Sequence, residues 1–347
     1  MKEYIHGGDI YRHPDVLDFS ANINPLGTPP AVVQAAKDSM EWICHYPDAC
    51  QEKLKQALAA YEQVPVEWLI CGNGAAELIF ALVQAVKPKR ALVMAPTFAE
   101  YAQALEAVGC EVDREILKKE DGFTLQRTIL EKLQKEDLQM VFLCNPNNPT
   151  GILINPKLLR EIVTICEKRN IYLIVDECFL DFVSEPEVHT LKGELEGKQY
   201  LFLLKAFTKR YAMAGLRLGY GITSSETLME KMEQQLQPWN VSMPAQEAGV
   251  EALKETAYVE KARELIFQEQ AFLKDGLKAC GYPVLDSQAN YVFFEGEPDL
   301  YEKLLEEGVM IRDCSNYPGL WKGCYRIAVK LHNENEQLLR KIRKVRR

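Results

Sequence analysis

The middle of the chain alternates short apolar segments with amphipathic ones, and this alternation limits the possible folds most strongly. The apolar segments are rich in Val, Ile, Leu and Phe and lie at 90–95, 140–145, 171–176, 200–205 and 218–223. Strands that are apolar on both faces lie inside a parallel sheet covered by helices. Helices are predicted between them at 76–86, 99–108, 124–134 and 156–169. The pattern predicts an α/β doubly wound fold.

Beyond about residue 230 the pattern changes. Long charged helices are predicted at 226–236 and 245–278, followed by short strands at 291–295, 309–312 and 325–329. A chain of 347 residues is long enough for one large and one small domain. We predict a large domain over 45–230 and a smaller α+β domain that combines 1–44 with 231–347.

Composition argues against several classes of protein. The formal net charge is −9 and the basic residues are scattered, which disfavours a nucleic-acid or membrane-surface partner. The longest apolar runs, such as 78–83, are too short to span a bilayer, and the N-terminus lacks the apolar stretch of a signal peptide. The ten cysteines show no Cys-x-x-Cys spacing. We therefore expect reduced thiols in a cytoplasmic protein and no metal site.

Two turns in the sequence have the character of ligand-binding turns. Residues 71–77 read CGNGAAE, a glycine-rich turn that enters a helix. Its backbone N–H groups and the helix dipole suit a phosphate, although an ordinary tight turn is the alternative. Residues 145–151 read NPNNPTG and follow a predicted strand. An asparagine held there can bind a ligand over the carboxyl ends of the strands, with a plain loop as the alternative.

Two charged residues follow later strands. Asp176 ends an apolar strand, where a carboxylate is costly unless a cation pairs with it. A protonated pyridine nitrogen would serve, and a helix N-cap or loop acid is the alternative. Lys209 follows the next strand and Arg217 lies eight residues later, so that an amine and a guanidinium can surround one ligand. A lysine near cations has a lowered pKa and is nucleophilic, whereas most single lysines are surface residues.

In this order, the four motifs resemble the fold-type I pyridoxal 5′-phosphate (PLP) enzymes of the aspartate aminotransferase family, over nearly the whole chain. The resemblance implies a fold-type I PLP-dependent transferase fold: a large domain with a mostly parallel seven-stranded sheet flanked by helices, plus the smaller α+β domain. It implies that Lys209 is the Schiff-base lysine and that Asp176 pairs with the pyridinium nitrogen. The further cofactor contacts that it implies are Tyr46, Gly74, Ala75, Phe98, Asn148, Thr208 and Arg217.

Each of these contacts has an implied role. Gly74, Ala75 and Arg217 would hold the cofactor phosphate, Phe98 would stack on the ring, and Asn148 would contact the ring hydroxyl. Tyr46 resembles a tyrosine that reaches the phosphate of a neighbouring subunit, which implies a homodimer with shared active sites. Ala206 stands where these families often carry Ser or Thr, which leaves Thr208, Arg217 and the backbone turn as phosphate donors.

Within this family, the sequence is similar to the histidinol-phosphate aminotransferases and to the threonine-phosphate decarboxylases of cobalamin biosynthesis. HGGDI at 6–10, DFSANINPLG at 18–27 and Phe179 favour the decarboxylases, because aminotransferases usually carry Tyr at the position of Phe179. This branch implies PLP-dependent decarboxylation of L-threonine O-3-phosphate to (R)-1-amino-2-propanol O-2-phosphate, the linker of the cobalamin nucleotide loop. A histidinol-phosphate aminotransferase is the alternative, and a non-catalytic PLP-binding protein is a minor one.

The expected substrate is a small phosphorylated amino acid with a carboxylate and a phosphate. Arginine binds both groups through paired hydrogen bonds, and Arg312 and Arg326 are the candidates. Arg326 matches the carboxylate-binding arginine of the family, and His6 and Asn22 are expected to help hold the substrate. The sequence leaves open which arginine takes which anion. It also leaves serine phosphate open as the substrate, because one methyl group is worth only roughly 1 kcal/mol of discrimination.

Overall fold

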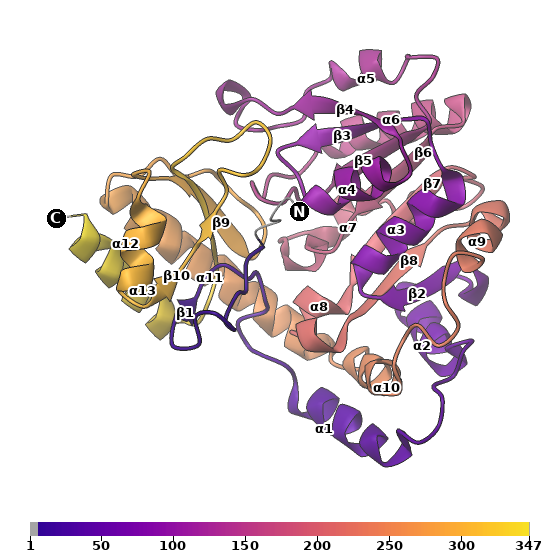
Figure 1. The fold of residues 1–347 in the computed structure, drawn as a ribbon, viewed down its shortest axis with the longest axis horizontal. Helices are drawn as coiled ribbons and strands as arrows, with labels where there is room; N and C mark the ends of the chain where they lie inside the picture. The colour runs from indigo at the N-terminus through magenta and orange to yellow at the C-terminus, as the bar shows by residue number, and fades with distance from the viewer. Residues whose placement is uncertain (1–5, 347) are drawn as a thin grey trace.

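A seven-stranded sheet lies at the centre of the larger part of the molecule (Figure 1). The computed structural model describes residues 6–346. In spatial order the strands are β2 (Leu69–Asn73), β8 (Leu218–Ile222), β7 (Leu201–Ala206), β6 (Tyr172–Asp176), β5 (Met140–Cys144), β3 (Arg90–Ala95) and β4 (Glu111–Ile116). Only β8 runs antiparallel to its neighbours in this sheet. The predicted mostly parallel seven-stranded sheet is confirmed.

The two strands that were not predicted, β2 and β4, are the edges of this sheet. An edge strand need not be apolar on both faces, and β4 carries charged residues that face solvent. β2 runs directly into the glycine-rich turn. Its short apolar segment therefore was not recognised as a strand, because the residues that follow are typical of a turn.

Helices cover the sheet, and their starts follow from local sequence. In α6 (Pro156–Arg169), the Asn155 side chain accepts the N–H groups of Lys157 and Leu158 at 2.9 and 3.3 Å, a standard N-cap. The other helices of this part are α1 (Pro30–Asp38), α2 (Glu52–Glu62), α3 (Ala75–Val86), α4 (Ala99–Ala107), α5 (Ile129–Lys132), α7 (Pro186–His189), α8 (Phe207–Arg210), α9 (Glu226–Glu233) and α10 (Met243–Ala252).

Two predicted helices differ from the structure. The helix expected at 124–134 is only the short α5, because Phe123 and Leu125 both turn into the core, a spacing of two residues that a helix does not allow. The single helix expected at 245–278 is two helices, α10 and α11 (Thr256–Ala279), separated by the short break after Ala252. No helix among residues 6–346 has the length and apolar character of a membrane span.

A smaller α+β layer packs beside the carboxyl ends of the central strands (Figure 1). Its antiparallel sheet has the order β11 (Arg312–Asp313), β12 (Cys324–Ala328) and β9 (Tyr291–Glu295). The N-terminal strand β1 (Leu17–Asp18) pairs in parallel with β10 (Val309–Met310), so the two ends of the chain meet here. The helices α11, α12 (Leu300–Glu306) and α13 (His332–Val345) complete the layer.

Buried side chains form two separate apolar cores. The larger core surrounds the central sheet and includes Val32 of α1 and Ala245 of α10. The smaller core contains Phe19 and most buried residues after Ile266. The division into 45–230 and 1–44 with 231–347 stays a prediction. We propose one refinement, that α1 and α10 move with the large domain because they share its core.

Candidate active site

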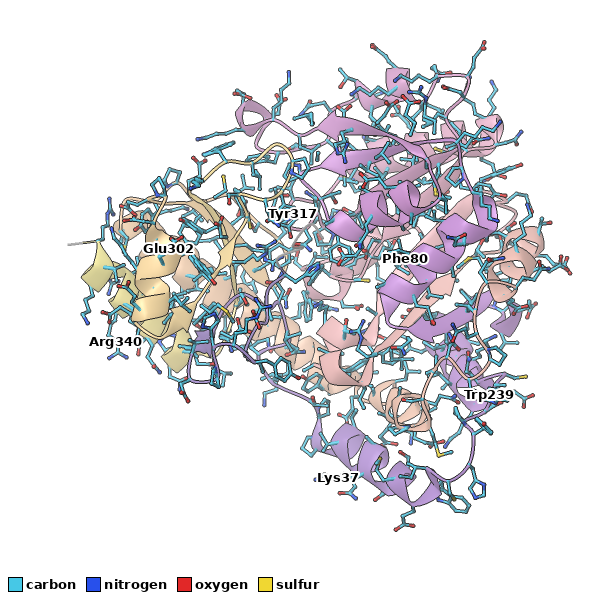
Figure 2. The ribbon with its side chains drawn as sticks, viewed as in Figure 1. Lys37, Phe80, Trp239, Glu302, Tyr317 and Arg340 are labelled. Carbon is cyan, nitrogen blue, oxygen red and sulfur yellow. The ribbon has the colours of Figure 1, made fainter. Side chains whose placement is uncertain are left out.

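A cavity lies where the carboxyl ends of the central strands face the small-domain sheet. Figure 2 labels Tyr317, one of its lining residues, between the two parts of the molecule. Ligands of open α/β sheets bind at this edge. Most predicted site residues line the cavity together: His6, Asn22, Ala75, Phe98, Asn148, Asp176, Thr208, Lys209, Arg217, Arg312 and Arg326.

Asp176 lies at the end of β6, buried beneath this cavity. Its two oxygens accept hydrogen bonds from the Tyr101 hydroxyl at 2.5 Å and from the Cys178 N–H at 2.9 Å. Burial raises the pKa of Asp176, and these hydrogen bonds oppose the rise. Among the described residues Asp176 forms no ion pair. A buried carboxylate with two neutral donors suits a cationic ligand atom.

Lys209 lies in α8, the single helical turn that follows β7. Burial lowers the pKa of Lys209 to about 8, and Arg326 and Arg217 act in the same direction. Its Nζ atom lies 5.8 Å from the centre of the Phe179 ring. The amine is therefore partly neutral near pH 8, which makes it a competent nucleophile.

The glycine-rich turn forms a close cradle at the N-terminus of α3. Gly74 has a left-handed φ of +79°, and a Cβ atom there would lie 2.5 Å from Nη2 of Arg217. On the other side, a Cβ atom at Gly219 would lie 2.4 Å from the backbone nitrogen of Ala75. Any side chain at either position would displace these donors. Backbone N–H groups, a helix N-terminus and a guanidinium together form an anion site.

The other predicted cofactor contacts surround the centre of the cavity. Phe98 packs edge-on against Tyr101, with 5.6 Å between the ring centres. Asn148 is buried, and its Oδ1 accepts a hydrogen bond from Nη1 of Arg326. Thr208 and Ala206 both line the cavity. The hydroxyl group of Thr208 can therefore replace the donor that an alanine at position 206 does not provide.

The two predicted substrate arginines stand side by side. Arg312 of β11 and Arg326 of β12 are directly opposite each other in the antiparallel pair, and both are about 95% buried. Directly opposite residues share one face of a sheet. Arg326 donates to the Ser20 carbonyl at 2.8 Å, and Arg312 donates to Asn316 Oδ1 at 2.9 Å. Neither guanidinium forms an ion pair with any carboxylate in residues 6–346.

The N-terminal segment brings two further predicted residues to the cavity. His6 Nε2 lies 3.6 Å from Oε1 of Glu100. Burial lowers the pKa of His6, and the positive charge of Arg312 acts in the same direction. Asn22 is buried, and its Oδ1 has no hydrogen-bond partner within the described chain. Both residues can offer polar atoms to a ligand.

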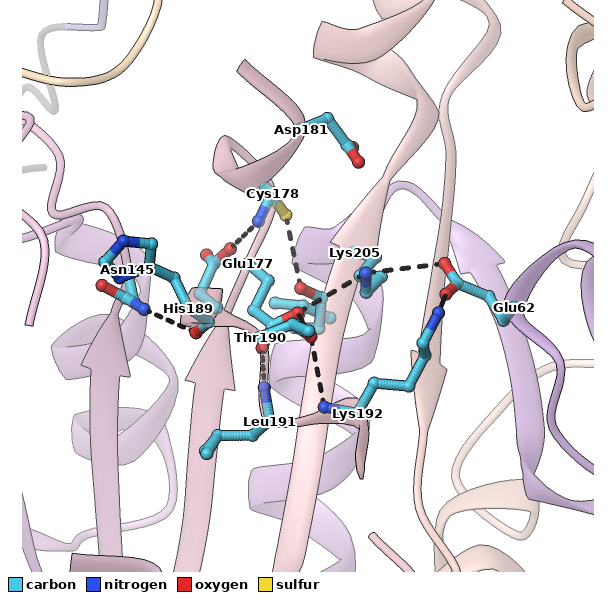
Figure 3. A network of polar contacts seen from close by, with 12 residues as sticks. Glu62, Asn145, Glu177, Cys178, Asp181, His189, Thr190, Leu191, Lys192 and Lys205 are labelled. Carbon is cyan, nitrogen blue, oxygen red and sulfur yellow. Dashed lines mark hydrogen bonds and ion pairs between the residues drawn. The ribbon is translucent and has the colours of Figure 1, made fainter. Parts of the chain in front are cut away.

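A buried ion network supports the cavity from behind (Figure 3). Glu177 follows Asp176 and accepts hydrogen bonds from Thr190 Oγ1 at 2.8 Å and from the Leu191 N–H at 2.9 Å. Lys205 of β7 lies 3.4 Å from Glu177 and 3.5 Å from Glu62 of α2. Burial would raise the pKa of Glu62, but three nearby cations, Lys205, Arg210 and Lys192, and a hydrogen bond from Tyr220 hold it at about 2. The end of β6, which carries Asp176, and the end of β7, which leads into the helix with Lys209, are therefore held by buried charged groups.

Tyr46 is a predicted site residue that lies outside this cavity. It does not line the cavity of its own chain. Instead, it is 77% exposed and stacks on Trp239, with 4.5 Å between ring centres. Its predicted role belongs to a neighbouring subunit and stays a prediction.

Several residues that line the two adjoining cavities had no predicted role, among them Tyr101, Glu100 and Tyr317. Tyr101 donates a hydrogen bond to Asp176, and Glu100 and Tyr317 line a small cavity together with Arg312. The sequence could have indicated Tyr101, because it follows Phe98 by three residues at the start of a helix. Residues at this spacing lie on the same face of the helix, so Tyr101 is expected near the same ligand as Phe98. Tyr317 lies in a loop, where no periodicity indicates direction.

The geometry agrees with comparisons to known proteins. Residues 14–342 match the model of the aminotransferase class I and II family. The chain belongs to this family. It is 41% identical to the threonine-phosphate decarboxylase of Salmonella typhimurium, over 98% of this chain and 96% of that protein.

Solved structures of family members share the fold. A histidinol-phosphate aminotransferase from Clostridium acetobutylicum superposes with a TM-score of 0.89 at 30% identity, over 95% of this chain and 99% of that one. An L-threonine-O-3-phosphate decarboxylase from Porphyromonas gingivalis gives a TM-score of 0.82 at 23% identity, over 94% and 98%. The fold is therefore common to both branches and does not decide between them.

Enzymes of this family use PLP, and the cavity fits that cofactor. The carboxylate of Asp176 lacks a cationic partner among the described residues, which suits a protonated ring nitrogen. The cradle of Gly74, Ala75 and Arg217 would hold the phosphate group, and the Lys209 amine would hold the cofactor covalently. We propose these roles for the individual residues.

The lowered pKa of Lys209 predicts how the apoprotein recombines with PLP. The rate should rise about fivefold between pH 7 and pH 8, and less than about twofold from pH 8 to pH 9, as the neutral amine fraction saturates. The absorbance of the bound cofactor measures this rate, and Lys209→Arg is the control that should not form the covalent species. A rate that still rises steeply above pH 9 would contradict the assigned cause.

Proposed function

We propose that this protein is a PLP-dependent decarboxylase that converts L-threonine O-3-phosphate into (R)-1-amino-2-propanol O-2-phosphate. The observation that carries the proposal is the pair Arg312 and Arg326. Two adjacent buried guanidinium groups repel each other and have lost most of their hydration. Because no carboxylate of the described chain pairs with them, they require an anionic ligand. A small amino acid with a carboxylate and a phosphate provides one anion for each.

The surroundings of the two arginines favour an assignment of the two anions. Arg326 donates a hydrogen bond to Asn148, a proposed contact of the cofactor ring, which supports a position near the reacting carbon. Arg312 instead donates a hydrogen bond to Asn316 and lines a second, smaller cavity with His6 and Tyr317. We propose that Arg326 binds the carboxylate and that Arg312 binds the phosphate.

Transamination is the competing reaction, since histidinol-phosphate aminotransferases share the fold. Histidinol phosphate carries one anionic group, although a dicarboxylic amino donor carries two. Phe179 favours decarboxylation by resemblance, because it lines the cavity where aminotransferases usually have a tyrosine. The relative with 41% identity, a threonine-phosphate decarboxylase, supports the same choice.

The chain supplies binding, orientation and proton transfer. When bound, PLP provides an electron sink for the pair that remains at Cα after CO₂ leaves. Arg326 grips the carboxylate and thereby sets which bond at Cα faces the ring. Tyr101 and the Cys178 N–H hold Asp176 in place at the cavity wall, where it would pair with the ring nitrogen. Lys209, with its pKa near 8, can carry a proton and deliver it to Cα in place of the lost carboxylate.

We also propose a homodimer with shared active sites. Several apolar side chains near Tyr46 are exposed, and such clusters mark contact surfaces: Met40, Trp42, Ile43 and Trp239. Figure 2 labels Trp239, which lies in the loop between α9 and α10. A neighbouring apolar groove, lined by Val33, Met40, Met213 and Leu216, extends the surface. Cytoplasmic location is part of the proposal, and the exposed free thiols of Cys44 and Cys50 are consistent with a reducing compartment.

The purified holoenzyme tests the function directly. Incubated with L-threonine O-phosphate and no oxo-acid, it should release CO₂ and accumulate aminopropanol phosphate. Lys209→Ala should abolish both. Absence of CO₂ release, with glutamate formed from histidinol phosphate and 2-oxoglutarate, would overturn the proposal in favour of the aminotransferase.

The two arginines should respond differently to substitution. Arg326→Gln should lower kcat/KM for threonine phosphate about a hundredfold or more, since a hydrogen-bonded charge pair is lost at the reacting centre. Arg312→Gln should raise the KM for threonine phosphate with little change in the binding of unphosphorylated threonine. Arg343→Gln, on the exposed face of α13, is the matched control. Equal loss of threonine binding in both variants would refute the assignment.

The proposed dimer can be tested by mass in solution. Sedimentation should give twice the chain mass, and the double variant Trp42→Asp with Ile43→Asp should shift the protein toward monomer. Phe267→Asp, at an equally exposed apolar side chain on α11, should leave the mass unchanged. Tyr46→Phe should keep the dimer but weaken cofactor binding roughly tenfold through loss of one hydrogen bond to a charged group. A monomeric wild-type holoenzyme would contradict the shared site.

A further inference from the structure

A second, smaller cavity opens beside the candidate active site. The two cavities share His6, Phe98, Arg312 and Tyr317 as lining residues. The smaller one is also lined by Glu100, in the first turn of α4. A carboxyl group therefore stands at the end of the site where Arg312 lies, the end to which we assign the substrate phosphate.

One oxygen of the Glu100 carboxyl group has no hydrogen-bond partner among the described residues. Its Oε1 lies 3.6 Å from Nε2 of His6, beyond hydrogen-bonding distance. Its Oε2 is buried and has no hydrogen-bond partner within residues 6–346. The side chain is only 15% exposed and makes no ion pair with Arg312 in that range. A buried polar oxygen without a partner is unusual in a native protein and points to a missing ligand.

Several charged or titratable groups face Glu100 from the surrounding elements. Burial raises the pKa of Glu100 to about 7, and the negative charge of Asp176 acts in the same direction. Lys209 and Arg312 oppose the rise. The groups that face it are His6 from the N-terminal segment, Asp176 from β6, Lys209 from α8, Arg312 from β11 and Tyr317 from the following loop. Near neutral pH the carboxyl group can therefore carry a proton.

We propose that Glu100 is a specificity-determining residue whose protonated carboxyl group donates a hydrogen bond to the substrate phosphate beside Arg312 and His6. The proposal rests on the proposed function and deepens it. An ionised Glu100 would repel a phosphate dianion, whereas a protonated one donates to it.

The number of oxygens in each anion explains why a hydrogen bond from Glu100 would favour a substrate phosphate over a carboxylate at this position. One arginine can satisfy both oxygens of a carboxylate through paired hydrogen bonds. A phosphate monoester has three terminal oxygens and needs further donors. Glu100 and His6 line the same small cavity as Arg312 and can supply these further donors. Side chains that end in a carboxylate, such as that of glutamate, would gain less from these additional donors.

Isopropyl phosphate is a suitable probe, because it copies the phosphate end of the substrate and has no amine to react with the cofactor. Its dissociation constant from the holoenzyme is measured by calorimetry between pH 6.5 and 8.5. For wild type, the dissociation constant should increase above pH 7 as Glu100 ionises, and the increase should approach a factor of ten for each pH unit. Glu100→Gln, which keeps a donor without titrating, should bind within about threefold of wild type at pH 6.5 and show a nearly flat profile. Glu100→Ala should bind about tenfold more weakly at pH 6.5.

Controls separate this inference from folding and from the proposed reaction. Glu106→Gln, on the exposed face of the same helix, should behave as wild type, and all variants should retain cofactor absorbance and melting temperature. A Glu100→Gln profile as steep as that of wild type would assign the titration to His6 and overturn the inference. Equal affinity of wild type and Glu100→Ala at pH 6.5 would do the same. CO₂ release tests the decarboxylase separately, because isopropyl phosphate binding does not require it.

Discussion

The buried carboxylate of Asp176 is the constraint around which the site is arranged. A negative charge at the end of a central strand is costly, and the structure limits this cost through Tyr101, the Cys178 N–H and the nearby lysine. Its neighbour Glu177 carries a second buried charge on the opposite face, held by Lys205, Thr190 and Leu191. The end of β6 is therefore anchored on both sides, and the short helix with Lys209 starts from the adjacent strand. Precise placement of these groups follows from the rigidity of a parallel sheet.

The two parts of the molecule divide the chemistry between them. The large domain holds the residues that suit a cofactor, and the small-domain sheet presents the two arginines that suit an anionic substrate. Phe179 and Tyr291 connect the two, since their rings pack edge-on with 5.2 Å between centres, and the Tyr291 hydroxyl donates to the Asn147 carbonyl at 2.9 Å. The substitution of Phe for the usual tyrosine therefore has two consequences. It removes a donor from the cavity and places an apolar ring at the boundary between domains.

The sequence predicted the central sheet well because buried parallel strands are apolar on both faces, as in β5 and β6. The prediction missed the edge strand β4, because that strand is polar. It was also wrong at residues 124–134, where the packing of Phe123 and Leu125 in the core prevents a long helix. Most residues of the site could be predicted from the sequence, because each one either follows a strand or lies in a recognisable motif. The pairing of Arg312 with Arg326 could not be read from the sequence, because register between strands 14 residues apart depends on the intervening loop. The unpartnered oxygen of Glu100 is likewise visible only in three dimensions.

The two separate cores have a thermodynamic consequence. The cavity is lined from both cores, so a ligand that binds the arginines and the cofactor site at once ties two cooperative units together. Binding to the native state alone stabilises it by about 2.7 kcal/mol when the ligand is present at a hundred times its dissociation constant. That energy is available only while both units are folded and in contact. Substrate would therefore act as a reversible cross-link that couples the unfolding of the two cores.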